Sequence, residues 1–228
     1  MSPFVNIHTH YNNHIDNNEF VEIQNIDVDN IVNVDVSHFY SIGIHPWNLK
    51  TQKFKNSEIQ KLGDLESGCL GDLNFLAIGE CGIDRVCGVD FEIQKEVFIK
   101  QIELSERIAK PLIIHAVRTY PDIISIRKET KAKQVWIIHG FQGNEQSAEQ
   151  LLRYADIYLS LGDVLFKNEA RAKQLLRIIP TDRLFFETDV AERKISDVYE
   201  KAALLSGLEM DKLRNDIFNN FVKIFGHI

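Results

Sequence analysis

Two histidines near the start of the chain, His8 and His10, have the spacing of a metal-binding pair. The residues before them (4–8) include apolar and β-branched side chains and predict a short strand. Side chains two residues apart on a strand point to the same face, so the two imidazoles are expected side by side. Neutral imidazoles bind borderline divalent ions such as zinc. An isolated HxH pair is more often a pair of surface or hydrogen-bonded core histidines, so the metal interpretation depends on the rest of the chain.

Several other stretches that predict strands also end in a histidine or a carboxylate. The run Leu112–Ile114, for example, is apolar throughout and stops at His115. Continuous apolar runs of this kind are typical of parallel strands that are buried on both faces. The metal-capable residues at these strand ends are, in order, His8, His10, Glu80, His115, His139 and Asp189.

The spacing of these six residues fits a repeating β/α unit. The gap from His10 to Glu80 is 70 residues, and the following gaps, which end at Asp189, are 35, 24 and 50 residues. A (β/α)8 barrel spends about 30 residues on each unit, so the gaps correspond to about two, one, one and two units. In that fold the active-site residues come from the C-terminal ends of several strands. The set therefore predicts a metal site in an α/β protein with a TIM (β/α)8 barrel.

The elements that must position these residues alternate between strand and helix, as in a parallel α/β fold. No convincing helix separates the first two expected strands, so the first βα unit is curtailed, and no linker or repeat divides the single domain expected over residues 1–228. The expected strands lie at 4–8, 20–26, within 31–44, and at 75–79, 112–114, 135–138, 157–160 and 184–186. The expected helices lie at 57–67, 91–109, 121–128, 145–154, 169–178, 195–205 and 210–225.

The donor types indicate more than one ion. Four imidazoles and two carboxylates exceed what a single tetrahedral zinc needs, and they suit two divalent metal ions (Zn, Mn or Mg) with one carboxylate between them. Such a pair can activate a water, hold a phosphoryl oxygen and stabilise a leaving oxygen. The expected chemistry is therefore hydrolysis, most naturally of a phosphoester. Asp189 is the expected general base, because the attacking water needs a proton acceptor within reach.

Six segments, in order, resemble the TatD family of metal-dependent hydrolases, many of which are DNases. These segments are NIHTHY, GIHPW, AIGECGID, PLIIHAVR, WIIHGFQGN and FFETD. The resemblance covers nearly the whole chain, and it implies a TIM barrel of the amidohydrolase type with a two-metal centre. By position, it implies one ion on His8, His10 and Asp189, the other on His115 and His139, and a bridging, catalytic role for Glu80.

Three further side chains are candidates for contact with the substrate. His45, in the segment GIHP, is placed at a substrate phosphate by the family resemblance, and the alternative is a turn histidine held by local hydrogen bonds. Arg118 can clamp a phosphate, because a guanidinium matches two phosphoryl oxygens, and the alternative is a surface salt bridge. Phe141 can stack on a base, but an aromatic in this setting is more often part of the packing.

The chain departs from the family's usual pattern at three places. The family usually has Asp where Asn6 stands. Its arginine two residues after the fifth-strand histidine is here Arg118, three residues on. The family commonly follows ETD with a proline-containing segment, whereas this chain continues with residues 190–193, VAER. These changes surround the six expected ligands, so they bear on the substrate more than on the metal centre.

Composition narrows the class of protein. The net charge of −7 and the pI of about 5.6 provide no basic surplus to hold nucleic acid by charge alone. The three cysteines, at positions 69, 81 and 87, show no CxxC spacing, and free thiols suit a reducing compartment. The first residues do not resemble a signal peptide, and no apolar run reaches the roughly 18 residues of a membrane span. A cytoplasmic protein without an evident obligate protein partner is expected.

The leading hypothesis is a divalent-metal-dependent hydrolase of phosphoester bonds, a TatD-like deoxyribonuclease whose water is activated by two metal ions. Its expected partner is DNA or another phosphoester. An alternative on the same barrel is a metal-dependent amidohydrolase, a lactonase or a small-molecule phosphoesterase, because a fold does not fix a substrate. A third hypothesis is a non-catalytic metal-binding module, and the presence of all six expected ligands argues against it.

Overall fold

The computed structural model of the protein describes residues 1–11, 19–28, 38–49 and 74–226. The chain divides into two compact units: a first unit of Met1–Gln24 and Ile137–Ile228, and a second unit of Asn25–Trp136. The helix expected at 57–67 lies outside the described residues. The single domain expected over the whole chain stays a prediction.

In the described part of the chain, eight strands follow one another in a hydrogen-bonded sheet in the order β1 to β8. The strands are β1 (Phe4–Thr9), β2 (Phe20–Asp27), β3 (Tyr40–Gly43), β4 (Phe75–Asp84), β5 (Leu112–Val117), β6 (Trp136–Ile138), β7 (Ile157–Leu161) and β8 (Leu184–Phe186). Neighbouring strands pair in parallel, and Thr9 of β1 bridges Asp189 beyond β8. This strand order confirms the expected TIM (β/α)8 fold.

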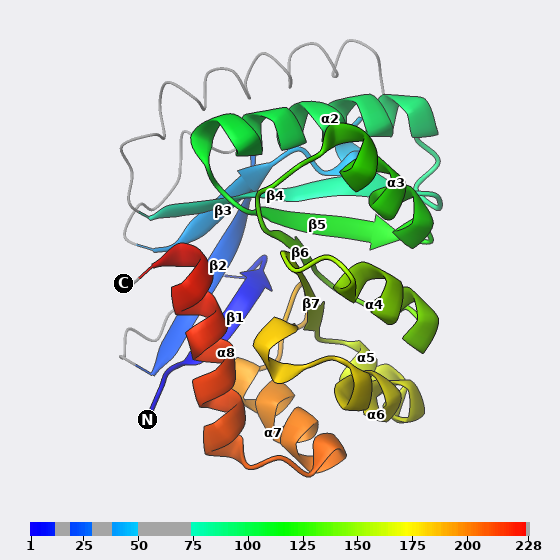
Figure 1. The fold of residues 1–228 in the computed structure, drawn as a ribbon. Coiled ribbons are helices and arrows are strands. Elements are labelled where there is room, and N and C mark those ends of the chain that lie inside the picture. Colours follow the sequence, from blue (N-terminus) through cyan, green and yellow to red (C-terminus); the bar gives the residue numbers. More distant parts are fainter. Residues whose placement is uncertain (12–18, 29–37, 50–73, 227–228) are drawn as a thin grey trace. The chain divides into compact units, whose positions relative to one another are not determined.

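Helices alternate with the strands from β4 onward (Figure 1). They are α2 (Phe91–Ile108), α3 (Tyr120–Thr130), α4 (Glu145–Leu152), α5 (Val164–Lys167), α6 (Glu169–Ile178), α7 (Ile195–Ser206) and α8 (Met210–Phe225). Side-chain caps fix several starts: Asp90 accepts hydrogen bonds from the first turn of α2, Asn144 from that of α4 and Asn168 from that of α6. The short helix α5 was not expected from the sequence.

In the first unit, α7 and α8 pack beside β1 (Figure 1). All six residues of β1 are buried, and Phe4 at its start packs edge-on against Tyr199 of α7, with ring centroids 5.1 Å apart. The Tyr199 hydroxyl accepts a hydrogen bond from Val5 N and donates one to Val5 O, both at 3.1 Å. Helix α7 therefore fixes the strand that carries His8.

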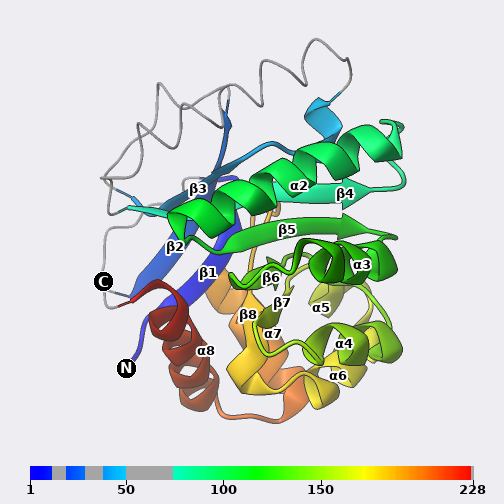
Figure 2. The ribbon, with the colours of Figure 1, turned by 45° about the horizontal axis from the view of Figure 1, so that its top comes forward.

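In the second unit, α2 lies along β4 (Figure 2). Strand β4 has ten residues, all buried, and extends five residues beyond the expected end at Gly79. The strand continues because its pairing with β5 runs on to Asp84 opposite Val117. At Gly82, which has a φ of +136°, a Cβ atom would lie 2.1 Å from the carbonyl oxygen of His115, so only glycine allows this close approach of the two strands.

The connection from β1 to β2 is short. Strand β1 ends at Thr9 and β2 begins at Phe20 in parallel with it, which leaves ten residues, 10–19, between them. This spacing is shorter than the dozen or more residues of a usual parallel crossover that contains a helix, and residues 12–18 lie outside the described part of the chain. Among the helices that the structure describes, none is long and apolar enough for a membrane crossing.

Candidate metal centre

The ends of β1, β6 and β8 bring four of the expected ligands together in the first unit. We call His8, His10, His139 and Asp189 the β1 group. The His8 ring centroid lies 5.0 Å from that of His10 and 4.3 Å from that of His139. The Nε2 atoms of His8 and His10 each lie 3.5 Å from Asp189 Oδ1. His8 and His139 are buried, whereas Asp189 is 37% exposed, so solvent reaches the group from the carboxylate side.

The backbone holds Asp189 against β1. Its amide donates a hydrogen bond to His8 O at 3.1 Å, and its carbonyl oxygen accepts one from His10 N at 3.1 Å. Asp189 has a φ of +53°, in the left-handed region that side chains other than glycine seldom adopt. Such a conformation persists where surrounding contacts determine it, and it often occurs at functional sites. The two backbone hydrogen bonds provide those contacts here.

A buried carboxylate, Glu187, stands behind His139. Glu187 Oε1 lies 3.5 Å from His139 Nδ1 and accepts a hydrogen bond from Gly140 N at 2.6 Å. Gly162 makes room for it, because a Cβ atom there would lie 3.0 Å from Glu187 Cγ. A carboxylate beside one ring nitrogen fixes a ligating histidine's orientation and leaves the other nitrogen for a metal. Glu187 is two residues before Asp189, but the sequence analysis assigned it no role.

Asn6 of β1 is hydrogen-bonded to Thr188, the residue just before Asp189. Its side-chain oxygen accepts a hydrogen bond from Thr188 N at 3.0 Å, and its Nδ2 donates to Thr188 Oγ1 at 2.9 Å and to Glu22 Oε1 at 3.0 Å. Asn6 is fully buried. The residue that departs from the family's usual Asp therefore uses both of its amide hydrogens, and one of them goes to a carboxylate.

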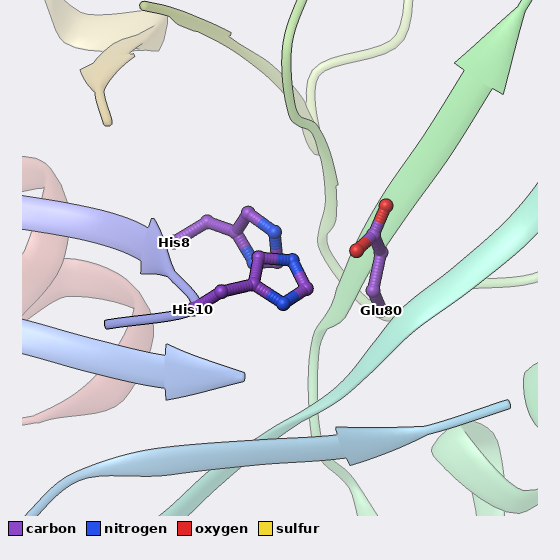
Figure 3. Close-up of side chains that lie close together, drawn as sticks. All are labelled: His8, His10 and Glu80. Atoms are coloured by element: carbon purple, nitrogen blue, oxygen red, sulfur yellow. The ribbon is translucent and has the colours of Figure 1, made fainter. Parts of the chain in front are cut away.

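Strands β4 and β5 and the residues just after β3 bring together a second set of donors in the second unit. We call His45, Glu80 and His115 the β4 group. Glu80 Oε1 lies 2.8 Å from His115 Nδ1 and 3.0 Å from His45 Nε2. Glu80 is 4% exposed and belongs to the buried strand β4. Figure 3 shows the Glu80 carboxylate and, at the end of β1, the neighbouring rings of His8 and His10.

Asp84 and Trp47 complete a closed set of contacts around the β4 group. Asp84 Oδ2 lies 3.2 Å from His115 Nε2 and accepts a hydrogen bond from Trp47 Nε1 at 2.6 Å. The Trp47 amide donates in turn to His45 Nδ1 at 3.2 Å. Both ring nitrogens of His45 and of His115 therefore have a polar neighbour, and the orientation of each ring is fixed. Asp84 lies four residues after Glu80 on β4, so the pleat directs both side chains to the same face.

Hydrogen bonds favour the ionised form of Asp84. Burial alone would raise the pKa of its carboxyl, but hydrogen bonds from the Trp47 indole, the Val86 amide and His115 outweigh burial and hold the pKa below its ordinary value. The neighbouring thiol of Cys81 behaves in the opposite way, because burial and the charge of Glu80 raise its pKa well above the ordinary value. Cys81 is therefore a protonated core thiol and not a thiolate ligand.

The donor chemistry of both groups fits divalent metal ions. In the β1 group, atoms of His8, His139 and Asp189 lie within 4.8 Å of one another, and the same holds for His45, Glu80 and His115 in the β4 group. Each set combines two imidazoles with one carboxylate, which is a common ligand combination for catalytic zinc. Borderline divalent ions accept both kinds of donor.

Comparison with known proteins identifies the family. Residues 7–226 match the family described as TatD related DNase. The chain belongs to the TatD family. This agrees with the resemblance seen in the six sequence segments, and it places the protein among metal-dependent hydrolases.

Individual relatives carry the same description. BU355 of Buchnera aphidicola, named an uncharacterized metal-dependent hydrolase, is 32% identical over 160 residues, which are 66% of this chain and 58% of that protein. YcfH of Escherichia coli K12, with the same description, is 28% identical over 202 residues, or 82% of this chain and 73% of that protein. The crystal structure of YJJV, a TatD homologue from E. coli K12, has a TM-score of 0.82 at 19% identity and covers 99% of this chain and 98% of its own. At this identity the likeness shows the fold alone.

The structure distributes the residues expected from the TatD resemblance between the two groups. His139 gathers with His8 and Asp189, whereas the resemblance assigned it to the ion of His115, and that assignment stays a prediction. His45 lies within the β4 group, not only at its rim. Arg118 is exposed, with a φ of +56°, just after β5. Phe141 is fully buried, which confirms packing as its role.

The sequence analysis missed three residues that support the TatD site. Glu187 and Asp84 lie at even spacing from Asp189 and Glu80, respectively, so the strand period could have suggested that they share a face with those expected ligands. The contact of Trp47 with Asp84 joins residues 37 apart in the chain, and no sequence spacing indicates it.

Proposed function

We propose that this TatD protein is a divalent-metal-dependent phosphoesterase that cleaves DNA. The observation that carries the proposal is the gathering of imidazole and carboxylate donors within or just after the strands of a (β/α)8 fold: His8, His139 and Asp189 in the first unit, and His45, Glu80 and His115 in the second. Nucleases and phosphatases commonly use pairs of divalent ions. The family's description as TatD related DNase supports DNA as the substrate.

The β1 group and the β4 group are each proposed to hold one divalent ion, with zinc favoured by the histidines and manganese or magnesium as alternatives. When bound, such ions polarise a phosphoryl oxygen and make a water more acidic. Within the β4 group, His45 faces Glu80 at 3.0 Å, which supports a ligand role beside the expected phosphate contact. The bridging role of Glu80 stays a prediction.

The chain's own side chains are proposed to orient the phosphate and move the proton. Asp189 is the proposed proton acceptor, because its carboxylate is partly exposed to water and its backbone is fixed against β1. Arg118 is the proposed phosphate clamp, since its guanidinium is exposed beyond the strand that carries His115. With a net charge of −7, the chain has no basic surplus, so the affinity for DNA is expected to depend only modestly on salt.

The proposed location is the cytoplasm, because Cys81 and Cys87 are free thiols, which suit a reducing compartment. DNA or another phosphoester is the proposed partner.

The test combines metal content per chain with cleavage of a labelled single-stranded oligonucleotide, with and without chelator. We expect two ions per chain and cleavage that the chelator abolishes. Glu80→Gln should lose most activity and bind less metal. The matched control is Glu149→Gln, the same change at an exposed position on α4, and it should retain both.

Other outcomes would redirect the proposal. Two ions without cleavage of DNA would move it to a small phosphoester, an amide or a lactone, to be distinguished with a panel of chromogenic substrates. Retained metal without turnover of any substrate would indicate a metal-binding module. A chain that takes up no metal on titration, or full activity in Glu80→Gln, would refute the site described above.

A further inference from the structure

Trp47 is an exposed indole in a fixed orientation. It is 52% exposed, whereas Trp136, the other tryptophan of the chain, is fully buried. Trp47 Nε1 donates a 2.6 Å hydrogen bond to the carboxylate of Asp84. This hydrogen bond orders the ring before any ligand arrives, which lowers the entropy cost of binding to its face.

The same carboxylate orders a second exposed apolar residue. Asp84 Oδ1 accepts a hydrogen bond from the amide of Val86, whose side chain is 58% exposed. Asp84 is itself 2% exposed. One buried carboxylate thus holds the indole of Trp47 and the backbone of Val86, and both residues face solvent. Ordered apolar surface beside a polar site commonly marks a place where a ligand binds.

The indole lies beside the β4 group. Its ring centroid is 5.1 Å from that of His45 and 6.0 Å from that of His115, and both ring pairs meet edge to face. A planar group attached to a phosphate held by the β4 group would therefore be close to the indole. In a nucleic acid the planar group next to a phosphate is a base, and bases stack on aromatic side chains whatever their sequence.

We propose that Trp47, held in place by Asp84, binds a nucleobase next to the phosphate that is cleaved. This inference rests on the proposed function and adds a contact that selects for substrates with a planar ring. It also fits the acidic composition: with a net charge of −7, the chain gains little from charge along a DNA backbone, and stacking adds a contact that does not depend on charge. Asp84 acts as a positioning residue, through Trp47 and His115.

The test compares two single-stranded oligomers of equal length and equal phosphate number, one of thymidine nucleotides and one of abasic sugars. We expect the wild-type holoenzyme to favour the thymidine oligomer by about tenfold in kcat/KM, which is the order expected from stacking of one base. Trp47→Leu should bring this ratio close to one, and Trp47→Phe should keep an intermediate ratio. The control is Leu204→Ala, at an exposed apolar position of α7, and it should keep the wild-type ratio.

Fluorescence measures binding without turnover. A phosphorothioate thymidine oligomer that resists cleavage should quench the emission of the holoenzyme, because Trp47 is exposed while Trp136 is buried, and the quenching should vanish in Trp47→Leu. A wild-type ratio near one, or an unchanged ratio in a folded Trp47→Leu protein, would overturn the proposal. If neither oligomer is cleaved, the nuclease function fails and the titration decides alone: quenching that depends on Trp47 supports ring binding, and its absence overturns it.

Discussion

Replacing Asn6 with Asp should lower the free energy of unfolding at pH 7 by about 2–4 kcal/mol, although Asp is the usual residue of the family at this position. The reason is Glu22, whose Oε1 accepts a hydrogen bond from Asn6 Nδ2 at 3.0 Å. The variant would place a second carboxylate at this distance. Asp has nearly the same shape as Asn, so the substitution leaves no cavity, and the effect comes from charge and hydrogen bonding.

The magnitude follows from the contacts of Asn6. Its Nδ2 donates one hydrogen bond to Glu22 and another, at 2.9 Å, to Thr188 Oγ1, and the variant loses both hydrogen bonds. The Thr188 hydroxyl can turn and donate to the new carboxylate, but Glu22 cannot, and two charges about 3 Å apart repel by about 5 kcal/mol at an effective dielectric constant near 20. The protein avoids part of this cost by protonating one carboxyl, which at pH 7 costs about 4 kcal/mol for an ordinary pKa near 4. This protonation cost sets the upper limit of the expected loss in the free energy of unfolding.

The assay is urea denaturation of four proteins: wild type, Asn6→Asp, Glu22→Gln and the double variant. The amide of a glutamine at position 22 can donate to an aspartate at position 6, so the double variant should recover most of the loss, with a coupling energy of about 2 kcal/mol. Wild-type stability in Asn6→Asp, or no recovery in the double variant, would refute the reasoning. The hydrogen bonds to Thr188 would then be the only contacts that matter at this position.

Three further predictions concern stability. Tyr199→Phe should lower the free energy of unfolding by about 2 kcal/mol in urea, because it leaves buried Val5 N and Val5 O without the hydroxyl; a change below about 0.5 kcal/mol would contradict this. Partial burial raises the pKa of Asp216, but hydrogen bonds from Lys212 and Thr181 have the larger, opposite effect, and the pKa lies below its ordinary value. The free energy of unfolding of wild type should therefore exceed that of Asp216→Asn by about 1 kcal/mol above pH 4, and this difference should disappear as the pH falls through the lowered pKa of Asp216. A difference that persists at pH 2 would count against the ion pair. Removing metal from the holoenzyme with a chelator should lower Tm, and adding metal back should restore it, because bound ions stabilise the folded state. An unchanged Tm would argue against resident metal.

The alternation of apolar runs and metal-capable side chains was sufficient to predict most of the fold. His8 and His10 lie side by side as the period of a strand requires, and Glu80 and His115 meet because each follows or lies within a strand of the same parallel sheet. Strand β4 was predicted too short, because the expected strand ended at Gly79. In the structure glycine at positions 79 and 82 allows close contact with β5, where any larger residue would collide with the neighbouring backbone.

The organisation of the site could not be read from spacing alone. Spacing along the chain places His139 at a strand end, but it does not tell which way the ring turns, and the contact with His8 depends on that direction. The roles of Asp84 and Trp47 depend on a hydrogen bond between residues far apart in sequence. Such contacts follow from the register of the strands and from side-chain rotamers, which a single sequence does not specify.

The segment after Asp189 shows how a departure from the family's pattern can be compensated. A proline there would restrict the backbone, since its ring fixes φ. In this chain Arg193 takes over that restraint: its Nη2 lies 2.9 Å from Asp163 Oδ1, and its guanidinium stacks 3.9 Å from the centroid of the Phe166 ring. The amide of Ala191 also donates to Thr188 O at 2.9 Å, which closes the turn directly around Asp189. The left-handed conformation of Asp189 is therefore held on one side by β1 and on the other by a turn that side chains restrain. The proposed proton acceptor can keep its place without the proline.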